Sequence, residues 1–163
     1  GTGSIWDHEI ESVANNYTPT TDDLIPTGEV VPLETKMIDG AATHWDLSEP
    51  KAFGCLDPTR SGIDINLVLP SQVNPSVSAV KVTAKNGFSL EVYTNQPGLQ
   101  FYTGKNLSSA HAGFSGQMYR PFKGFCLEPQ KFPSSLTIPS FPSIICTPEQ
   151  PYKQTTSIKI SST

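Results

Sequence analysis

Val77-Ser78-Ala79-Val80-Lys81-Val82-Thr83 is followed by Ala84-Lys85-Asn86-Gly87 and then by Phe88-Ser89-Leu90-Glu91-Val92-Tyr93-Thr94. Apolar and polar residues alternate on both sides of the central segment, which is the pattern of strands that bury one face. An Asn-Gly pair between two alternating segments is the strongest short-range signal for a β-hairpin. The stretch therefore predicts two antiparallel strands, at 77–83 and 88–94, with the turn at Asn86-Gly87.

The same alternation recurs along the chain, and it predicts further strands at 63–69, 98–104, 124–128 and 156–161. His8 to Ala14 fits a strand as well as a helical turn. The chain has 15 Pro and 12 Gly residues, and both residue types interrupt helices. Short strands with frequent turn signals predict an all-β protein, a sandwich or a barrel.

The composition and the motifs limit the classes of function that this chain can have. The 163 residues suit one domain, 1–163, or part of a larger one, and their net charge of −4 argues against nucleic-acid binding, which needs a basic face. The sequence contains no apolar run near the roughly 20 residues of a membrane span. Dinucleotide, phosphate-loop and nucleophile-elbow motifs are also missing from the sequence. We therefore expect no nucleic-acid partner, no membrane and no cofactor.

Cys55, Cys126 and Cys146 are far apart, with no histidine at metal-ligand spacing, so we interpret them as structural thiols or disulfide partners. Two glycosylation sequons are candidates, at Asn16-Tyr17-Thr18 and Asn106-Leu107-Ser108. Low charge with many Ser, Thr and Pro residues favours an extracellular protein, with a cytoplasmic one as the alternative. The sequence starts without an initiator methionine, so a processed chain is expected.

The segment from Pro129 to Pro151 is rich in proline but is not expected to be disordered, because disordered segments contain few aromatic and aliphatic residues. We predict an ordered loop that packs its large apolar side chains. These are Phe132, Leu136, Ile138, Phe141, Ile144 and Ile145.

Carboxylates inside strands are the main candidates for chemistry, because a carboxylate among apolar residues needs a partner or a shifted pKa. Asp64 lies between two isoleucines, Glu128 follows Phe-Cys-Leu, and Glu91 lies in the predicted hairpin. Simple alternation would turn each of them outward to water, and this reading applies most strongly to Glu91. The run from Gln96 to Gly104 combines amides with aromatic rings, including Gln100, and such a combination suits sugar recognition.

Taken together, the motifs resemble those of the aldose 1-epimerase family, over essentially the whole chain and in the family's order. The long match around Gln100 and the Gly-Phe-Cys-Leu-Glu run are the most specific. The matching stretches are Asp7-His8-Glu9, Tyr17-Thr18-Pro19, Leu24-Ile25-Pro26-Thr27-Gly28-Glu29-Val30, Trp45-Asp46-Leu47, Gly62-Ile63-Asp64, 90–104, 124–130, Phe132-Pro133 and Phe141-Pro142.

The resemblance implies the C-terminal half of a large antiparallel β-sandwich, with the N-terminal half on a separate chain. It implies a metal-free and cofactor-free reaction on a monosaccharide, with Glu128 as the general base and with Asp64 and Gln100 as sugar ligands. The acid would be a histidine of the N-terminal half, because His8, His44 and His111 do not match the family's catalytic positions. The Asp7-His8 pair is interpreted as structural.

Two departures from the family pattern bear on activity. Ile65 stands where the family usually has a histidine, and we expect this change to weaken a polar network beside Asp64. Pro129 follows Glu128, removes one backbone donor and favours extended geometry at the glutamate, which a strand tolerates. The alternatives to an epimerase are a non-catalytic carbohydrate-binding protein of the same fold and an inactive fragment.

Overall fold

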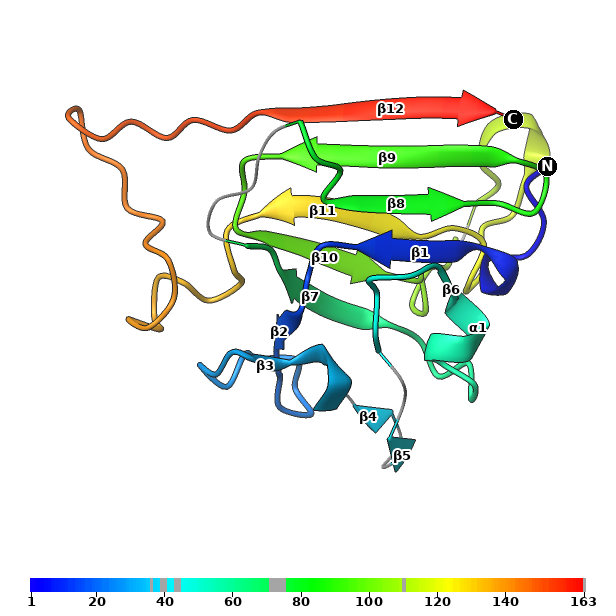
Figure 1. Ribbon diagram of the computed structural model, residues 1–163. Helices are drawn as coiled ribbons and strands as arrows, with labels where there is room; N and C mark the ends of the chain where they lie inside the picture. Colours follow the sequence, from blue (N-terminus) through cyan, green and yellow to red (C-terminus); the bar gives the residue numbers. More distant parts are fainter. Residues whose placement is uncertain (36, 39–40, 43–44, 71–75, 110, 163) are drawn as a thin grey trace.

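The computed structural model describes residues 1–35, 37–38, 41–42, 45–70, 76–109 and 111–162. His44 lies outside the described residues. The elements, drawn in Figure 1, are η1 (Ile5–Asp7), β1 (Glu9–Ser12), β2 (Asn16–Thr18), β3 (Val31–Pro32), η2 (Leu33–Thr35), β4 (Met37–Ile38), β5 (Ala41–Ala42), β6 (Lys51–Ala52), α1 (Phe53–Leu56), β7 (Asp64–Val68), β8 (Val80–Thr83), β9 (Phe88–Thr94), β10 (Gly98–Tyr102), η3 (Phe114–Gly116), β11 (Cys126–Gln130) and β12 (Thr156–Ser162).

Two antiparallel five-stranded sheets make the molecule, and helix is confined to single turns among the described residues. The first sheet has the strand order β12-β9-β8-β1-β6 and the second has the order β11-β10-β7-β2-β3. A separate two-stranded ladder joins β4 and β5. The all-β prediction is thus confirmed, and the two layers form a sandwich rather than a closed barrel (Figure 1).

The predicted hairpin is present as β8 and β9, paired from Val80 with Val92 to Thr83 with Ser89. Its pairing extends one step further, because the Ala84 N–H donates to the Phe88 carbonyl at 2.8 Å. Three residues therefore form the loop, and Gly87 at its end has a φ of 84°. This is the three-residue hairpin loop that ends in a left-handed glycine, so the turn contains Lys85 as well as Asn86-Gly87.

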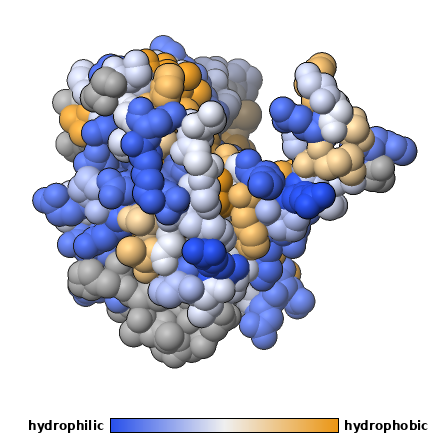
Figure 2. Space-filling model, turned by 90° about the vertical axis from the view of Figure 1, so that its right-hand side faces the viewer, coloured by the Kyte–Doolittle hydropathy of each residue, from blue (hydrophilic) through white to orange (hydrophobic). Residues whose placement is uncertain are grey.

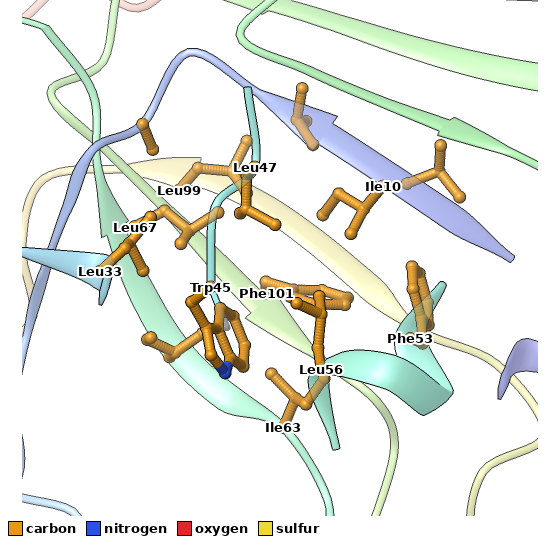
Figure 3. Packing of buried hydrophobic residues seen from close by; sticks show 14 of the residues in the cluster. Ile10, Leu33, Trp45, Leu47, Phe53, Leu56, Ile63, Leu67, Leu99 and Phe101 are labelled. Carbon is orange, nitrogen blue, oxygen red and sulfur yellow. The ribbon is translucent and has the colours of Figure 1, made fainter. Parts of the chain in front are cut away.

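The core lies between the two sheets (Figure 3). The first sheet contributes Ile10 and valines of β8 and β9, while the second contributes alternate residues of β7 and β10. Phe53 of α1 lies edge-on to Phe101 with ring centres 4.9 Å apart. Both rings are fully buried, so the short α1 closes one end of the core.

The proline-rich segment is only partly packed. Phe132 and Phe141 are buried against each other, edge to face, with ring centres 5.2 Å apart. Leu136, Ile144 and Ile145, however, are 70%, 41% and 70% exposed, so the prediction that all the large apolar side chains pack is wrong for these three. After Phe141 the chain extends away from the sheets before it returns as β12, as Figure 1 shows in orange.

The strands β12 and β9 leave an apolar area uncovered. The register places Ile158 and Ile160 of β12 on the same side of the sheet as the buried Val92, yet they are 62% and 69% exposed. Phe88 of β9 lies on that side too and is half exposed. Figure 2 shows hydrophobic surface at the top of the molecule, the end where Figure 1 places these strands. We call Phe88, Ile158 and Ile160 the open apolar edge.

Candidate active site on the outer face of the second sheet

Three neighbouring strands bring the predicted site residues together. Gln100 of β10 is paired with Glu128 of β11 on one side and with Asn66 of β7 on the other. Asp64 is two residues before Asn66 in β7. Because alternate residues of a strand share a face, Asp64, Gln100 and Glu128 project from the same face of the sheet. The opposite face supplies core residues, namely Ile65, Leu67, Leu99 and Phe101.

A short hydrogen bond links two of these side chains. The Gln100 Nε2 atom donates to Asp64 Oδ1 at 2.6 Å. A hydrogen bond to an ionised carboxylate is about twice as strong as a neutral one, so it fixes the amide. The Gln100 Oε1 atom is buried and has no hydrogen-bond partner within the described part of the chain. One end of this amide is therefore committed to Asp64, while the other can still accept a donor.

Glu128 is exposed on this face, and Cys126 is its neighbour two residues earlier in β11. Partial burial raises the pKa of the Cys126 thiol, and a hydrogen bond to Glu128 and the negative charges of Glu128 and Asp64 raise it further. The pKa of the Cys126 thiol therefore depends on both carboxylates. Their shared influence indicates a concentrated negative potential on the face that Glu128 and Asp64 occupy.

A buried carboxylate fixes the backbone just before Asp64. Asp57 is fully buried and accepts a hydrogen bond from the Gly62 N–H at 2.7 Å. The next residue, Ile63, donates its N–H to the Thr103 hydroxyl at 2.8 Å. These contacts tie the start of β7 to the end of β10, so the strand carrying Asp64 is held in register with the strand carrying Gln100.

Pro129 is accommodated as the sequence predicts. It lies in β11, which is the edge strand of the second sheet, and an edge strand can lose one N–H without breaking a central ladder. Its carbonyl accepts a hydrogen bond from Gln154 Nε2 at 2.9 Å. The segment that leads to β12 is thereby attached to the strand that carries Glu128.

The expectation for Ile65 is wrong. Its side chain is buried among core residues, on the opposite face from Asp64. Strand alternation separates the two side chains, so Ile65 takes no part in a polar network on the outer face. The departure from the family pattern at this position is a matter of core packing.

His8 has the structural role expected of it. The ring is 5% exposed, its Nδ1 lies 2.9 Å from the Ser4 carbonyl, and Phe53 and Phe125 pack against it. Its neighbour Asp7 pairs with Lys85 at 3.1 Å. His111, by contrast, is exposed in the long connection between β10 and β11.

The two sequons differ in their surroundings. Asn106 is exposed in a loop, and its backbone N–H donates to the Tyr102 hydroxyl at 2.7 Å. Asn16 is half-buried in β2, and Thr18 of the same sequon is 2% exposed. Asn106 is therefore the sequon with room for a glycan, and its modification stays a prediction.

The three cysteines carry free, exposed thiols. Among the described residues, no three His, Cys, Asp or Glu side chains gather closely enough to hold a metal ion. Over the same residues, no helix has the length and apolar character to cross a membrane.

Sequence reasoning missed two polar residues of this face. Asn66 and Thr18 are buried, directly opposite each other in β7 and β2, and joined by a 3.1 Å hydrogen bond from Asn66 Nδ2 to Thr18 Oγ1. Asn66 lies between Ile65 and Leu67, so it was hidden in an apolar run. Its even spacing from Asp64 is the signal that could have revealed it.

The fold and this face define a class. The chain is an antiparallel β-sandwich protein that presents carboxylates and side-chain amides on one sheet face, where they can accept hydrogen bonds from hydroxyl groups. Residues 1–159 match the family model described as aldose 1-epimerase. The chain therefore belongs to the aldose 1-epimerase family.

Curated relatives agree with this assignment. The galactose mutarotases of Rattus norvegicus and Homo sapiens are each 38% identical to the chain, in alignments that cover 99% and 97% of its length. The chain spans about half the length of these relatives, 46% and 45% respectively.

Solved structures show the fold. A GalM/aldose epimerase homologue from C. elegans superposes with a TM-score of 0.77 at 20% identity, covering 98% of this chain and 47% of that one. Galactose 1-epimerase from Lactobacillus acidophilus gives a TM-score of 0.55 at 18% identity, covering 98% and 45%.

Proposed function

We propose that this chain forms the C-terminal half of an aldose 1-epimerase that interconverts the α and β anomers of an aldohexose such as glucose or galactose. The observation that carries the proposal is the cross-strand arrangement of Asp64, Gln100 and Glu128 on one open face. Membership of the aldose 1-epimerase family supports it.

The reaction needs a base at the anomeric hydroxyl and an acid at the ring oxygen of the sugar. Glu128 takes the proton from the anomeric hydroxyl, O1, and its exposed position leaves room for a ring to approach. As the electrons of O1 form the carbonyl, the bond from C1 to the ring oxygen breaks and that oxygen takes up a proton. The open aldehyde rotates about its C1–C2 bond, and the C5 hydroxyl attacks the other face of C1. That hydroxyl returns its proton to the group that supplied it, while Glu128 returns its proton to O1.

Asp64 and Gln100 hold the sugar during these steps. The carboxylate of Asp64 accepts hydrogen bonds from sugar hydroxyls, and the amide of Gln100 orients it through their 2.6 Å contact. Glu128 lies exposed beside them, with the Cys126 thiol as its hydrogen-bonding neighbour, and serves proton transfer in this division of roles.

The acid comes from outside this chain in our proposal. His8 is committed to the core, so it cannot meet a sugar on the outer face of the second sheet. The exposed apolar side chains of the open apolar edge also need another part of the protein to pack against them. We propose that the N-terminal half of the domain, on a separate chain as expected from the sequence, packs over this edge and supplies the acid.

The test compares the chain alone with the chain assembled with its N-terminal half. Polarimetry follows freshly dissolved α-glucose and α-galactose, corrected for the spontaneous rate. We expect acceleration only by the assembly. Glu128→Gln should lower it by about 10²–10⁴-fold, because the amide keeps the size but cannot accept the proton, and calorimetry should show sugar binding largely unchanged.

Glu9→Gln is the matched control, because Glu9 is an exposed strand glutamate of the other sheet. Normal turnover in Glu128→Gln would remove Glu128 as the base. Sugar binding by the wild-type assembly without any acceleration would favour the non-catalytic carbohydrate-binding alternative.

A further inference from the structure

The connection between β10 and β11 differs in charge from the rest of the chain. Residues 104–124 contain Lys105, Arg120 and Lys123 and neither aspartate nor glutamate, although the whole chain has a net charge of −4. All three side chains are exposed, and none of the ion pairs among the described residues involves them. Their positive charge is therefore available to a partner. We call the described part of this connection the basic loop.

The basic loop is an ordered projection that runs out from the second sheet and back to it. At its base, the Phe122 N–H donates to the Gly104 carbonyl at 3.1 Å. Toward its tip, the Gly113 N–H donates to the Gln117 carbonyl at 2.7 Å, and the single turn η3 lies between these two residues. Figure 1 shows the loop in yellow-green, at the end of the molecule that also carries both labelled termini.

The tip of the basic loop is apolar. Phe114 in η3 is 91% exposed, and Met118 and Tyr119 are 48% and 41% exposed. The Tyr119 N–H donates to the Ser109 hydroxyl at 3.2 Å, and a Cβ atom on Gly113 would lie 2.6 Å from the Tyr119 ring. The turn is thus braced by its own side chains and holds a whole aromatic ring outward. Apolar surface presented in this way marks a site of interaction.

The cations of the basic loop lie behind its apolar tip. Arg120 directly follows Tyr119, and Lys105 and Lys123 lie at the base of the loop. A bilayer surface matches this arrangement, because apolar side chains enter the boundary between headgroups and acyl chains while basic side chains attract anionic headgroups. The order of the two kinds of residue along the loop follows the order of the two layers.

We propose that the basic loop docks this protein on the surface of a lipid bilayer that contains anionic lipids. Phe114 inserts at the interface, and Arg120 and Lys123 face the headgroups. The small area of the tip favours a bilayer over a second protein, because a stable protein–protein interface takes about 800 Å² from each partner. The sequence argued against a membrane span, and a contact at the surface needs none. The inference does not depend on the proposed epimerase activity.

The experiment measures binding to vesicles by co-sedimentation. It uses the full chain, alone and assembled with its N-terminal half. Vesicles of mixed phosphatidylcholine and phosphatidylserine are compared with vesicles of phosphatidylcholine alone. We expect both forms of the protein to bind the mixed vesicles at least about fivefold more strongly, because each cation near an anionic surface contributes about that factor. Added salt should weaken the binding.

Two substitutions test the two parts of the loop. Phe114→Ser should weaken binding to the mixed vesicles about tenfold, because it removes the inserted ring. Leu136→Ser is its matched control, since Leu136 is 70% exposed in another segment. Arg120→Ser should weaken binding about fivefold. Its control is Lys153→Ser, because Lys153 is an exposed cation outside the basic loop and takes part in none of the ion pairs between described residues. Neither control should alter binding.

Phe114→Trp keeps the tip apolar and reports insertion directly, even if Phe114→Ser fails to fold. Trp6 and Trp45 are buried, so an added tryptophan at the tip should be the one that responds to lipid. Its emission should shift to the blue on mixed vesicles and should be quenched by lipids with brominated acyl chains. Bound protein without quenching would overturn the insertion of the tip.

Three further outcomes would overturn the inference. They are an assembly that binds no vesicles, equal binding to both kinds of vesicle, and binding that Phe114→Ser and Arg120→Ser leave unchanged. Binding of a polyglutamate peptide through Phe114 and Arg120, without binding of vesicles, would overturn it in favour of an acidic protein partner. Polarimetry of the same proteins tests the epimerase proposal separately, because neither residue belongs to the candidate active site.

Discussion

Asp57 shows how a residue without a chemical role can determine the site. Its carboxylate accepts hydrogen bonds from the Thr59 hydroxyl at 3.0 Å, the Ser61 N–H at 3.1 Å and the Gly62 N–H at 2.7 Å. These contacts shape the turn that enters β7, and the turn sets the backbone from which Asp64 projects. A polar loop thus depends on a single fully buried side chain.

Asp57→Asn should lower the free energy of unfolding by about 1–3 kcal/mol, because the amide replaces an acceptor with a donor that faces backbone N–H groups. Urea denaturation measures the loss. Asp22→Asn, in an exposed turn, is the control and should change stability by less than about 0.5 kcal/mol. Equal stability of the two variants would show that the turn does not need the carboxylate.

At the scale of elements, β10 requires a residue without a side chain at its first position. A Cβ atom on Gly98 would lie 2.6 Å from Asn66 Oδ1 and 2.8 Å from the Phe132 ring. The glycine lets the ring of Phe132 cover the sheet next to the candidate site. The backbone of β10 is extended there, so the requirement comes from space and not from φ.

Gly98→Ala should therefore cost about 1–3 kcal/mol of stability through overpacking, and it should displace Phe132. Thermal or urea unfolding measures the cost, and the chemical shifts of the Phe132 ring report the displacement. Gly124→Ala provides the comparison, because a Cβ there meets nothing within 4 Å. A Gly98→Ala protein as stable as Gly124→Ala would contradict the close packing.

The pairing of β12 with β9 is coupled to pH. The pKa of Glu91 lies below its ordinary value of 4.5, first because the Tyr93 hydroxyl donates to it and next because Lys159 does, at 2.9 Å. The same contact raises the pKa of Lys159 above 10.5. The pair therefore stabilises β12 fully between these two values. Its contribution is lost as pH falls through the lowered pKa of Glu91 or rises through the raised pKa of Lys159.

Acidification from pH 7 to pH 3 should accordingly release β12 before it releases the hairpin. Amide hydrogen exchange, compared between Ile158–Ile160 and Val80–Thr83 after correction for intrinsic rates, measures the order. Glu91→Gln should remove most of this selective effect, whereas Glu11→Gln, which breaks the ion pair with Lys81 in another part of the sheet, should not. Uniform acceleration in both strands would contradict the assignment.

The elements also show what the sequence could predict. The strands β9 and β12 were found almost to the residue, because seven alternating residues make a clear pattern. The strands β2, β3 and β6 were missed, because two or three residues carry no period and exist only through their pairing with distant strands. Their residue types within predicted strands made Asp64, Gln100 and Glu128 candidates, and the family resemblance gave them roles. Only the register shows that they share a face.

At the scale of the whole molecule, the open apolar edge predicts how the chain behaves by itself. Ile158 and Ile160 lie in β12 and Phe88 in the adjacent β9, and β12 is also a sheet edge with unpaired backbone groups. Exposed apolar edge strands promote association. The isolated chain should self-associate with rising concentration in sedimentation velocity.

The double variant Ile158→Lys/Ile160→Lys should suppress that association and weaken assembly with the N-terminal half. The corresponding pair Ser157 and Ser161, on the other face of β12, is the control for added charge. A cooperative, soluble monomer of the wild-type chain at all concentrations would show that the chain needs no cover.

Alternation in β7, β10 and β11 also has a consequence for protein engineering. Asp64 faces outward while Ile65 faces the core, and the same parity holds across the three strands, so the even-numbered positions form the ligand-facing set and the odd-numbered ones the packing set. A mutational library restricted to even positions can vary the proposed sugar-binding face with little risk to folding. Gly98 and Asn66 are the exceptions, because they pack against each other and leave no space for a larger side chain. Selection for new activity can thus use the even-numbered positions, and selection for solubility the odd-numbered positions, of the same three strands.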